Sequence, residues 1–352
     1  DKPRGPKLDL RLRTERVGDL RRVWTSVDAD CLRAGAAGVA RGDWRSRAAL
    51  RFTARVRRAD TLLDWMPFLH DRLGAAKLTG LADATGSAGW DAASLETRLD
   101  LDATHLSWDP GRPGRPAKRA GDPAGVNLHL RADAFGAWLA GLAARGDATV
   151  RLGGSRLALN GSASLRPGAL ANGPVIAGFS PVSCDLDLRG TLAVDGPARR
   201  ALPWLDHLAE AVALDGDLGA ACAVTLTPKG YRFAADLDAN RLVVGGIALD
   251  ANREWILAKP AAMPGTIRLR GRAPTDLSRV RLDSSALRLG SLHATAAGRV
   301  DLLADPNGRV GGRLGDARLA VSSRDVSDLA RIVPRLAEAR PRGGAFADVQ
   351  LV

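Results

Sequence analysis

Alternation of apolar and polar residues with a period of two is the feature that most constrains the fold of this 352-residue chain. Successive side chains of a β-strand point to opposite sides, so such a segment has one apolar and one polar face. The same alternation recurs at 8–13, 95–102, 126–131 and 185–189. The longest case is 44–57, where Trp44, Ala48, Leu50, Phe52, Ala54 and Val56 alternate with Arg45, Arg47, Arg51, Thr53, Arg55 and Arg57.

Turn residues separate these strand segments and predict antiparallel hairpins. The stretch 227–230 reads Thr-Pro-Lys-Gly and 305–308 reads Asp-Pro-Asn-Gly, and Asn160-Gly161 is a dipeptide typical of tight hairpin turns. Antiparallel strands joined by short turns form a meander that can have one wet and one apolar side. We therefore expect a mainly β fold built on a long antiparallel sheet.

Short amphipathic helix candidates interrupt the strands at 61–73, 133–142, 197–208 and 325–336. Their starts are 72, 64 and 128 residues apart, and the last spacing is twice 64. A fifth start is expected near 261, with 274–278 as its reduced counterpart. This spacing predicts repeats of about 65–70 residues, each a short helix followed by strands. The region 1–352 would then be one elongated repetitive unit with starts at 61, 133, 197, 261 and 325.

Positive charge is concentrated in two places. The net charge is +12, and residues 1–60 hold 16 basic and 8 acidic side chains. The Pro-, Gly- and Arg-rich stretch 109–125 predicts a mobile basic loop. Such patches attract phosphate in nucleic acid or lipid headgroups, although a plain solvated surface has the same composition. Aromatic residues do not interleave with the basic ones and no reading motif occurs, which argues against nucleic acid as a partner.

Motifs for catalysis or metal binding are missing from the sequence. It contains no HExxH, GxSxG or GxxxxGK[ST], its five His do not have metal-ligand spacing, and its three Cys form no CxxC. We therefore expect neither an enzyme nor a bound metal or cofactor. No run of 18 apolar residues occurs either.

Three segments with Leu-x-Gly-x-Leu-like strands carry a resemblance to a known family: 157–165, 188–192 and 286–302. Together with the helix-then-hairpin order, they resemble the AsmA-like family of bacterial envelope proteins, relatives of the bridge-like lipid-transfer proteins. The resemblance implies a curved sheet that forms an open groove (a β-taco), with short helices inserted at repeat junctions. It also implies a periplasmic location, an inner-membrane anchor outside this excerpt of a longer chain, phospholipid as partner, and a role in outer-membrane homeostasis. The family has no catalytic residues to carry over.

Two sets of residues follow as candidates for contact with lipid, and two other readings stay open. A structural or adhesive β-repeat protein with closed, packed cores needs the same alternation, and a secreted hydrolase of unrecognised type is a weaker option. Basic headgroup contacts are predicted at Arg51, Arg55, Arg57, Arg112, Arg115, Lys118 and Arg119. The predicted lining of the groove is Leu50, Phe52, Val56, Leu99, Leu101, Leu128, Leu130, Leu157, Leu159, Leu186, Leu188, Val224, Leu226, Phe233, Leu237, Leu287, Leu289, Val300 and Leu302.

Overall fold

The chain is mainly β, and its strands pair antiparallel throughout the ladders described below. The structure is a computed structural model. It describes residues 8–42, 47–61, 77–91, 93–109, 117–133, 142–167, 179–202, 205–206, 212–227, 229–248, 256–275, 279–304, 310–337 and 342–351.

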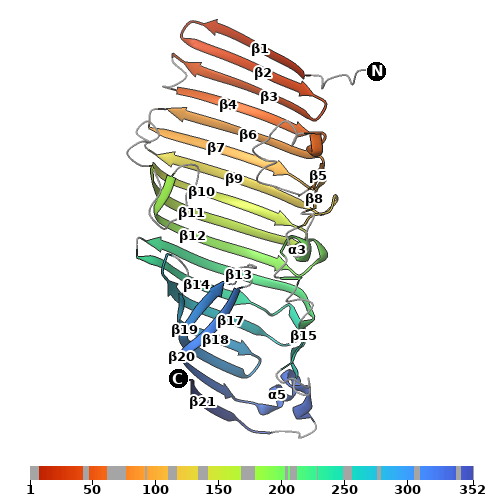
Figure 1. The fold of residues 1–352 in the computed structure, drawn as a ribbon, viewed down its shortest axis with the longest axis vertical. Coiled ribbons are helices and arrows are strands. Elements are labelled where there is room, and N and C mark those ends of the chain that lie inside the picture. Colours follow the sequence, from red (N-terminus) through yellow and green to blue (C-terminus); the bar gives the residue numbers. More distant parts are fainter. Residues whose placement is uncertain are drawn as a thin grey trace. The chain divides into compact units, whose positions relative to one another are not determined.

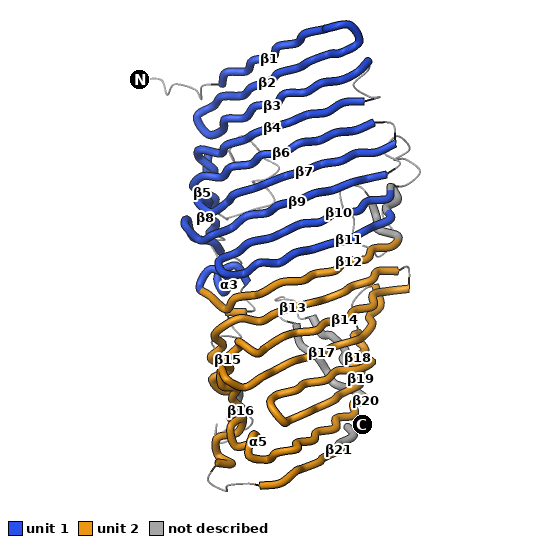
Figure 2. Tube along the Cα trace, turned by 180° about the vertical axis from the view of Figure 1, so that it is seen from behind, with its two compact units in different colours: residues 1–167, 196–203 blue, residues 168–195, 204–352 orange. Residues whose placement is uncertain are grey.

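Two units divide the chain, one made of residues 1–167 and 196–203 and the other of residues 168–195 and 204–352. Figure 2 colours unit 1 blue and unit 2 orange. Each unit is built around its own run of hydrogen-bonded neighbouring strands (Figure 1).

Unit 1 has a sheet with the strand order β1-β2-β3-β4-β6-β7-β9-β10-β11. A separate two-stranded pair, β5 with β8, accompanies it. The strands are β1 (Leu8–Val17), β2 (Leu20–Ala29), β3 (Leu32–Arg41), β4 (Arg47–Val56), β5 (Lys77–Gly80), β6 (Ala82–Asp91), β7 (Ser94–Asp102), β8 (Leu106–Asp109), β9 (Ala124–Asp133), β10 (Leu142–Leu152) and β11 (Ser155–Pro167).

Unit 2 has a sheet with the order β12-β13-β14-β17-β18-β19-β20-β21, and β15 pairs with both β13 and β16. The strands are β12 (Phe179–Ala193), β13 (Leu214–Thr227), β14 (Gly230–Asp238), β15 (Leu242–Ala248), β16 (Ile256–Lys259), β17 (Gly265–Ala273), β18 (Arg279–Leu289), β19 (Leu292–Ala304), β20 (Val310–Ser323) and β21 (Ala345–Leu351).

Short helical elements accompany the strands among the described residues, among them α3 (Gly196–Ala201), α5 (Val326–Ile332) and the 3₁₀ helix η2 (Pro334–Ala337). These three lie within or beside the segments 197–208 and 325–336, where helices were predicted. Asp325 caps α5, because its carboxylate accepts a hydrogen bond from the Ser327 N–H. The predicted helices at 61–73 and 133–142 fall almost entirely outside the described residues, as does 276–278 of the reduced fifth one.

The turns agree with the sequence at one position and differ at another. Thr227 pairs with Gly230, so β13 and β14 form the predicted hairpin. The predicted turn at Asn160-Gly161 is wrong, because both residues lie inside β11 and pair with β10. The turn is at Gly153-Gly154 instead, where Gly153 has a φ of +58° that glycine adopts without steric cost. The predicted turn at 305–308 lies outside the described residues, between the paired ends of β19 and β20.

Large, fully buried side chains are few in the described chain. In unit 1 the buried hydrophobic residues are small ones: Ala29, Cys31, Ala40, Ala48, Ala59, Ala132 and Ala198. In unit 2 a compact core is formed where α5 meets the end of the sheet, by Met263, Leu289, Leu292 and Ile332.

Candidate functional site

The apolar residues of unit 1 share one face of its sheet, because the register of each strand pair keeps them aligned. Two neighbouring cross-strand rows illustrate this from β1 to β11. One row is Leu12, Thr25, Ala36, Phe52, Gly86, Leu99, Leu128, Ala148 and Leu159; the other is Leu10, Val27, Ala34, Ala54, Ala84, Leu101, Val126, Val150 and Leu157. We call this surface the unit 1 apolar face.

Large side chains on the unit 1 apolar face are only half-buried. Leu50, Phe52, Leu99 and Leu128 all have intermediate exposure, whereas residues buried in this face, such as Ala48, are small. Among the described elements of unit 1, those in extensive contact with each other are all neighbouring strands joined by hydrogen bonds. Among the described residues, neighbouring side chains of the same face therefore contribute to this burial, and part of the apolar area of the large side chains stays exposed.

The first strand of unit 1 is the most exposed part of this face. Leu8, Leu10 and Leu12 of β1 are 52%, 65% and 72% exposed. Among the described residues β1 pairs with β2 only, so these leucines have strand neighbours on one side. Their exposure shows how much burial a flanking strand contributes to the leucines further along the sheet.

Unit 2 has a corresponding unit 2 apolar face. Its β14 residues Phe233 and Leu237 are opposite Val224 and Ala220 of β13, and Leu237 is followed by Ile267 and Leu287 on β17 and β18. One end of this face is covered: α5 packs Ile332, which is 1% exposed, against Met263, Leu289 and Leu292. The unit 2 apolar face thus combines half-buried leucines with a closed core at one end.

The structure brings most of the predicted lining residues together within their units. In unit 1, β4, β7, β9 and β11 hold Leu50, Phe52, Val56, Leu99, Leu101, Leu128, Leu130, Leu157 and Leu159 on one face. In unit 2, β12, β13, β14 and β18 hold Leu186, Leu188, Val224, Leu226, Phe233, Leu237, Leu287 and Leu289 on one face. Val300 and Leu302 lie in β19, but their side chains are outside the described set.

The predicted basic contacts are mostly used within the fold. Arg55 forms an ion pair with Asp83 across strands, and the Arg57 guanidinium is 3.2 Å from a carboxylate oxygen of Asp28. Arg51 lines a shallow pocket beside Trp24 on the polar face. Arg112 and Arg115 lie outside the described residues.

Lys118 in particular differs from its prediction as a headgroup contact in a mobile loop. Its ammonium donates hydrogen bonds to the backbone oxygens of Thr104, Leu106 and Arg119, at 3.0, 2.7 and 3.1 Å. An ammonium has three N–H donors, so all of them are used by the backbone. Burial lowers the pKa of this group.

The described end of the predicted loop is also attached to the rest of unit 1. Asp122 is held by Arg200, with 2.6 Å between the carboxylate and guanidinium, and both side chains are largely shielded. The strand β9 begins at Ala124. The segment 117–123 is therefore part of the folded unit, while 110–116 lies outside the described residues.

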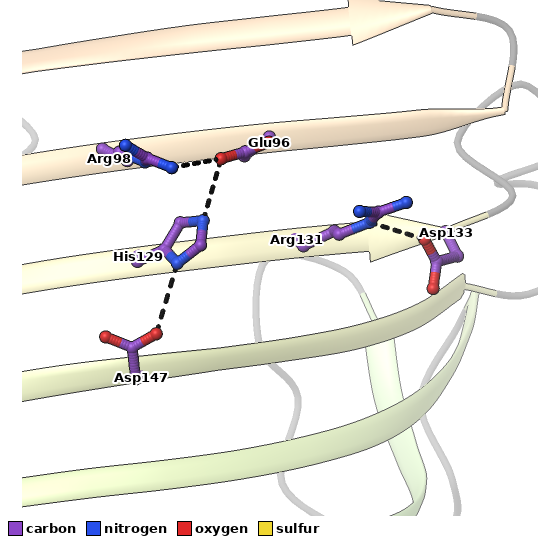
Figure 3. A network of polar contacts seen from close by, with 6 residues as sticks. All are labelled: Glu96, Arg98, His129, Arg131, Asp133 and Asp147. Carbon is purple, nitrogen blue, oxygen red and sulfur yellow. Dashed lines mark hydrogen bonds and ion pairs between the residues drawn. The ribbon is translucent and has the colours of Figure 1, made fainter.

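The polar face of unit 1 carries a network that sequence reasoning missed (Figure 3). His129 on β9 lies between two carboxylates, with Nε2 3.0 Å from Glu96 on β7 and Nδ1 3.2 Å from Asp147 on β10. Arg98 donates a second bond to Glu96 at 2.9 Å. A carboxylate can only accept hydrogen bonds. The two contacts of His129 are therefore both hydrogen bonds only when each ring nitrogen carries a proton.

We expect the contribution of this network to the stability of the fold to depend on pH. The hydrogen bonds from His129 and Arg98 lower the pKa of Glu96. A glutamate carboxyl has a pKa of about 4.3 in the unfolded chain. When its pKa is lower in the folded protein, the carboxylate stabilises the fold fully at pH values above the unfolded pKa. That stabilisation is lost as the pH falls through the pKa of the folded state. We expect Glu96→Gln to lower the urea midpoint at pH 7, and the difference from wild type to shrink toward zero at strongly acid pH.

The control is Glu15→Gln, which changes an exposed carboxyl of β1 that has no ion-pair partner among the described residues. It should give the same urea midpoint as wild type at both pH values. A Glu96→Gln difference that stays constant from pH 7 down to strong acid would contradict the assigned role of the network.

In the described part of the chain, no group of three or more His, Cys, Asp or Glu could hold a metal ion, and Cys31, Cys184 and Cys222 are free thiols. None of the helices in the described residues is long and apolar enough to cross a bilayer.

Comparisons of the chain with protein-family models, curated proteins and solved structures find no match. Any function assigned to the chain therefore depends on its own residues and their arrangement.

Proposed function

We propose that the chain binds the acyl chains of phospholipids along its apolar faces and acts in lipid transfer in a bacterial envelope. The observation that carries the proposal is the unit 1 apolar face, on which leucines of β4, β7, β9 and β11 stay half-buried. A face of this kind offers continuous apolar area, whereas a protein stabilised by a closed core would bury its largest side chains there.

The dimensions of the unit 1 apolar face suit an acyl chain. Eight steps separate β1 from β11, and steps of about 4.8 Å give a strip of about 38 Å. The hydrocarbon part of a bilayer is about 30 Å thick, or about 15 Å for each leaflet. One acyl chain therefore fits along the strip with room to move.

The energy of such binding needs no specific polar contact. Burial of hydrocarbon contributes about 0.8 kcal/mol per methylene, so a 16-carbon chain gains at most about 12 kcal/mol. A half-covered chain gains less, in proportion to the area removed from water. Aliphatic side chains without polar atoms suit a ligand that must slide as well as bind.

The remaining parts of the proposal rest on the resemblance to AsmA-like proteins. We infer a periplasmic location, a membrane at one or both ends of the full-length protein, and a contribution to outer-membrane homeostasis. Curvature of the sheet into an open groove, with helices at repeat junctions, belongs to the same inference. Catalysis is not part of the proposed function.

A second candidate is a structural or adhesive β-repeat protein whose apolar faces pack shut. The core of Met263, Leu289, Leu292 and Ile332 in unit 2 favours this candidate, because a helix closes the sheet there. A face that is fully closed in this way would leave no path for an acyl chain.

Leu99→Asp together with Leu128→Asp tests the proposed function. The two residues are cross-strand partners on β7 and β9 of the unit 1 apolar face. Carboxylates at these positions must stay hydrated, so they oppose an acyl chain lying over the row. We expect wild type to co-purify with phospholipid in native mass spectrometry, and the double variant to bind a fluorescent phospholipid at least about tenfold more weakly.

The matched control adds two carboxylates to the polar face instead. Ser87 and Ser162 are cross-strand partners of Arg98 and Arg145, so Ser87→Asp with Ser162→Asp places each new charge opposite an arginine. This variant should bind lipid as wild type does. Wild-type protein that carries no lipid after gentle extraction and does not bind the fluorescent phospholipid would falsify the proposal.

A further inference from the structure

Several arginines on the polar faces have a carboxylate partner, whereas one pocket of unit 2 gathers basic side chains that have none among the described residues. Arg55 pairs with Asp83, Arg98 with Glu96, Arg318 with Asp348 and Arg268 with Asp236. In contrast, Arg288, His293 and Arg324 have no ion-pair partner among the described residues. All three line the same pocket, which has a volume of about 480 Å³.

The strand register places this pocket on the polar side of the unit 2 sheet. Thr266, Arg288, His293 and Ser322 form one cross-strand row over β17, β18, β19 and β20. The residues that alternate with them, among them Ile267, Leu287 and Ala294, belong to the unit 2 apolar face. The pocket is therefore separated from the proposed acyl-chain surface by the sheet itself.

Donors dominate the walls of the pocket. Three arginines, Arg268, Arg288 and Arg324, line it together with Thr266 and Ser322, whose side chains carry hydroxyl groups. Asp236 offsets part of the charge of Arg268 at 3.2 Å, and Asp238 is the neighbour of Thr266 on β14. Arg288 and Arg324 are left as full positive charges that face a concave surface.

A neighbouring pocket extends the same chemistry across the sheet. It has a volume of about 650 Å³, shares Arg268 and Ala286 with the first pocket, and adds Arg270 and Arg318. Arg270 also lacks a partner among the described residues, whereas Arg318 is paired with Asp348. The charged area is thus large enough for a ligand bigger than a bare inorganic ion.

We propose that the pocket formed by Arg268, Arg288 and Arg324 is a binding site for a phosphate group. Guanidinium groups present paired N–H donors that match the oxygens of a phosphate, and hydroxyl groups complete the ring of donors. The phosphate could belong to a soluble phosphate ester or to the headgroup of a lipid in a membrane surface. This inference does not depend on acyl-chain binding, because the two surfaces are on opposite sides of the sheet.

Isothermal titration of the full chain with inorganic phosphate tests the site. Arg288→Gln with Arg324→Gln removes both unpaired guanidinium charges and keeps polar side chains of similar length. We expect wild type to bind phosphate and the double variant to bind it about tenfold more weakly, since charge-assisted bonds are lost. Both side chains are exposed, so the far-ultraviolet spectrum should not change.

The control is Arg21→Gln with Arg22→Gln, which removes two exposed charges from β2 of unit 1. It should leave phosphate binding unchanged. Equal losses in both double variants would mean that net charge alone attracts the anion, and phosphate that fails to bind wild type at tens of millimolar would also overturn the site.

Vesicles identify the source of the phosphate group. Vesicles of phosphatidylcholine with and without phosphatidylglycerol are mixed with wild type and both double variants, and sedimentation measures the bound fraction. Binding to phosphatidylglycerol vesicles that the Arg288/Arg324 variant alone loses assigns the site to lipid headgroups. Binding of inorganic phosphate without binding of vesicles assigns it to soluble phosphate esters.

Discussion

Replacing Ile332 with alanine should lower the free energy of unfolding of unit 2 by about 3 kcal/mol. The side chain is 1% exposed and packs with Met263, Leu289 and Leu292, with Leu329 and Val333 beside it. Truncation of a buried isoleucine to alanine typically costs about 2–5 kcal/mol, because it loses the transfer free energy and leaves a cavity. Chemical denaturation followed by far-ultraviolet circular dichroism measures the change.

Helix α5 should respond most strongly, because Ile332 lies within it. It is seven residues long, and besides this core it is attached by hydrogen bonds from the Val326 N–H to Gly343 and from the Ser291 N–H to Asp328. Helices of this length are not stable alone in water. Hydrogen exchange should therefore show lost protection in α5 first and smaller losses in β18 and β19.

The control is Leu319→Ala, on β20 of the same unit 2 apolar face. Leu319 is 38% exposed, so its truncation should cost less than about 1 kcal/mol. Equal effects of Ile332→Ala and Leu319→Ala would contradict the difference between a closed core and an open apolar face within unit 2.

The strands and their faces could be predicted because burial imposes the pattern directly. Each strand exposes one face to water, so polar residues must occupy every second position, and slipping by one residue would exchange the faces. Leu99 and Leu101 alternate with Asp100 and Asp102 in the sequence, and in β7 the two leucines lie on one face and the two aspartates on the other, as expected.

Changes in the phase of the alternation also have a visible cause. On β18, Val280 and Leu282 have even numbers, whereas Leu287 and Leu289 have odd numbers. The register shifts by one residue between Leu282 and Ser285, a β-bulge that returns all four to the same face. A phase change inside one strand therefore predicts a bulge, and this signal was available in the sequence.

The mistaken turn at Asn160-Gly161 shows why a local dipeptide is weaker than the pattern around it. The alternation begun by Leu157 and Leu159 continues through Gly161 and Ala163, which remain on the unit 1 apolar face. A turn at Gly161 would have exposed that face, so β11 continues. Gly153-Gly154 supplies the turn instead, at the point where the alternation stops.

Polar networks could not be predicted, because they depend on register between strands far apart in sequence. His129 and Glu96 are 33 positions apart, and Lys118 and Thr104 are 14 apart. No sequence spacing links them until the strands are paired. The same holds for the phosphate pocket, whose residues come from β17, β18, β19 and β20 and the segments that follow β18 and β20.

Replacing Gly86 with valine should destabilise unit 1 by about 2–3 kcal/mol, although valine normally favours a strand. Gly86 lies on β6 opposite Phe52 of β4, and a Cβ added there would meet the Phe52 ring and, at 2.5 Å, the Arg98 carbonyl oxygen. The ring thus rests over the glycine. Gly89→Val in the same strand is the control: the nearest atom to its added Cβ is 3.9 Å away, so the urea midpoint should stay the same or rise.

A double-mutant cycle with Phe52→Ala separates the ring from the backbone. If the ring is the main obstacle, Gly86→Val and Phe52→Ala together should cost clearly less than the sum of the two single changes. Additive losses would mean that the Arg98 carbonyl alone excludes the side chain.

The same pairing recurs in unit 2, where a Cβ on Gly271 of β17 would lie 2.6 Å from the Phe233 ring on β14. Phenylalanine over glycine keeps a large apolar ring down against the sheet in both units. Because glycine leaves the neighbouring position empty, the ring fills that space and does not project from the face. Gly271→Val should therefore both destabilise unit 2 and, if acyl chains use this face, weaken lipid binding by displacing the ring outward.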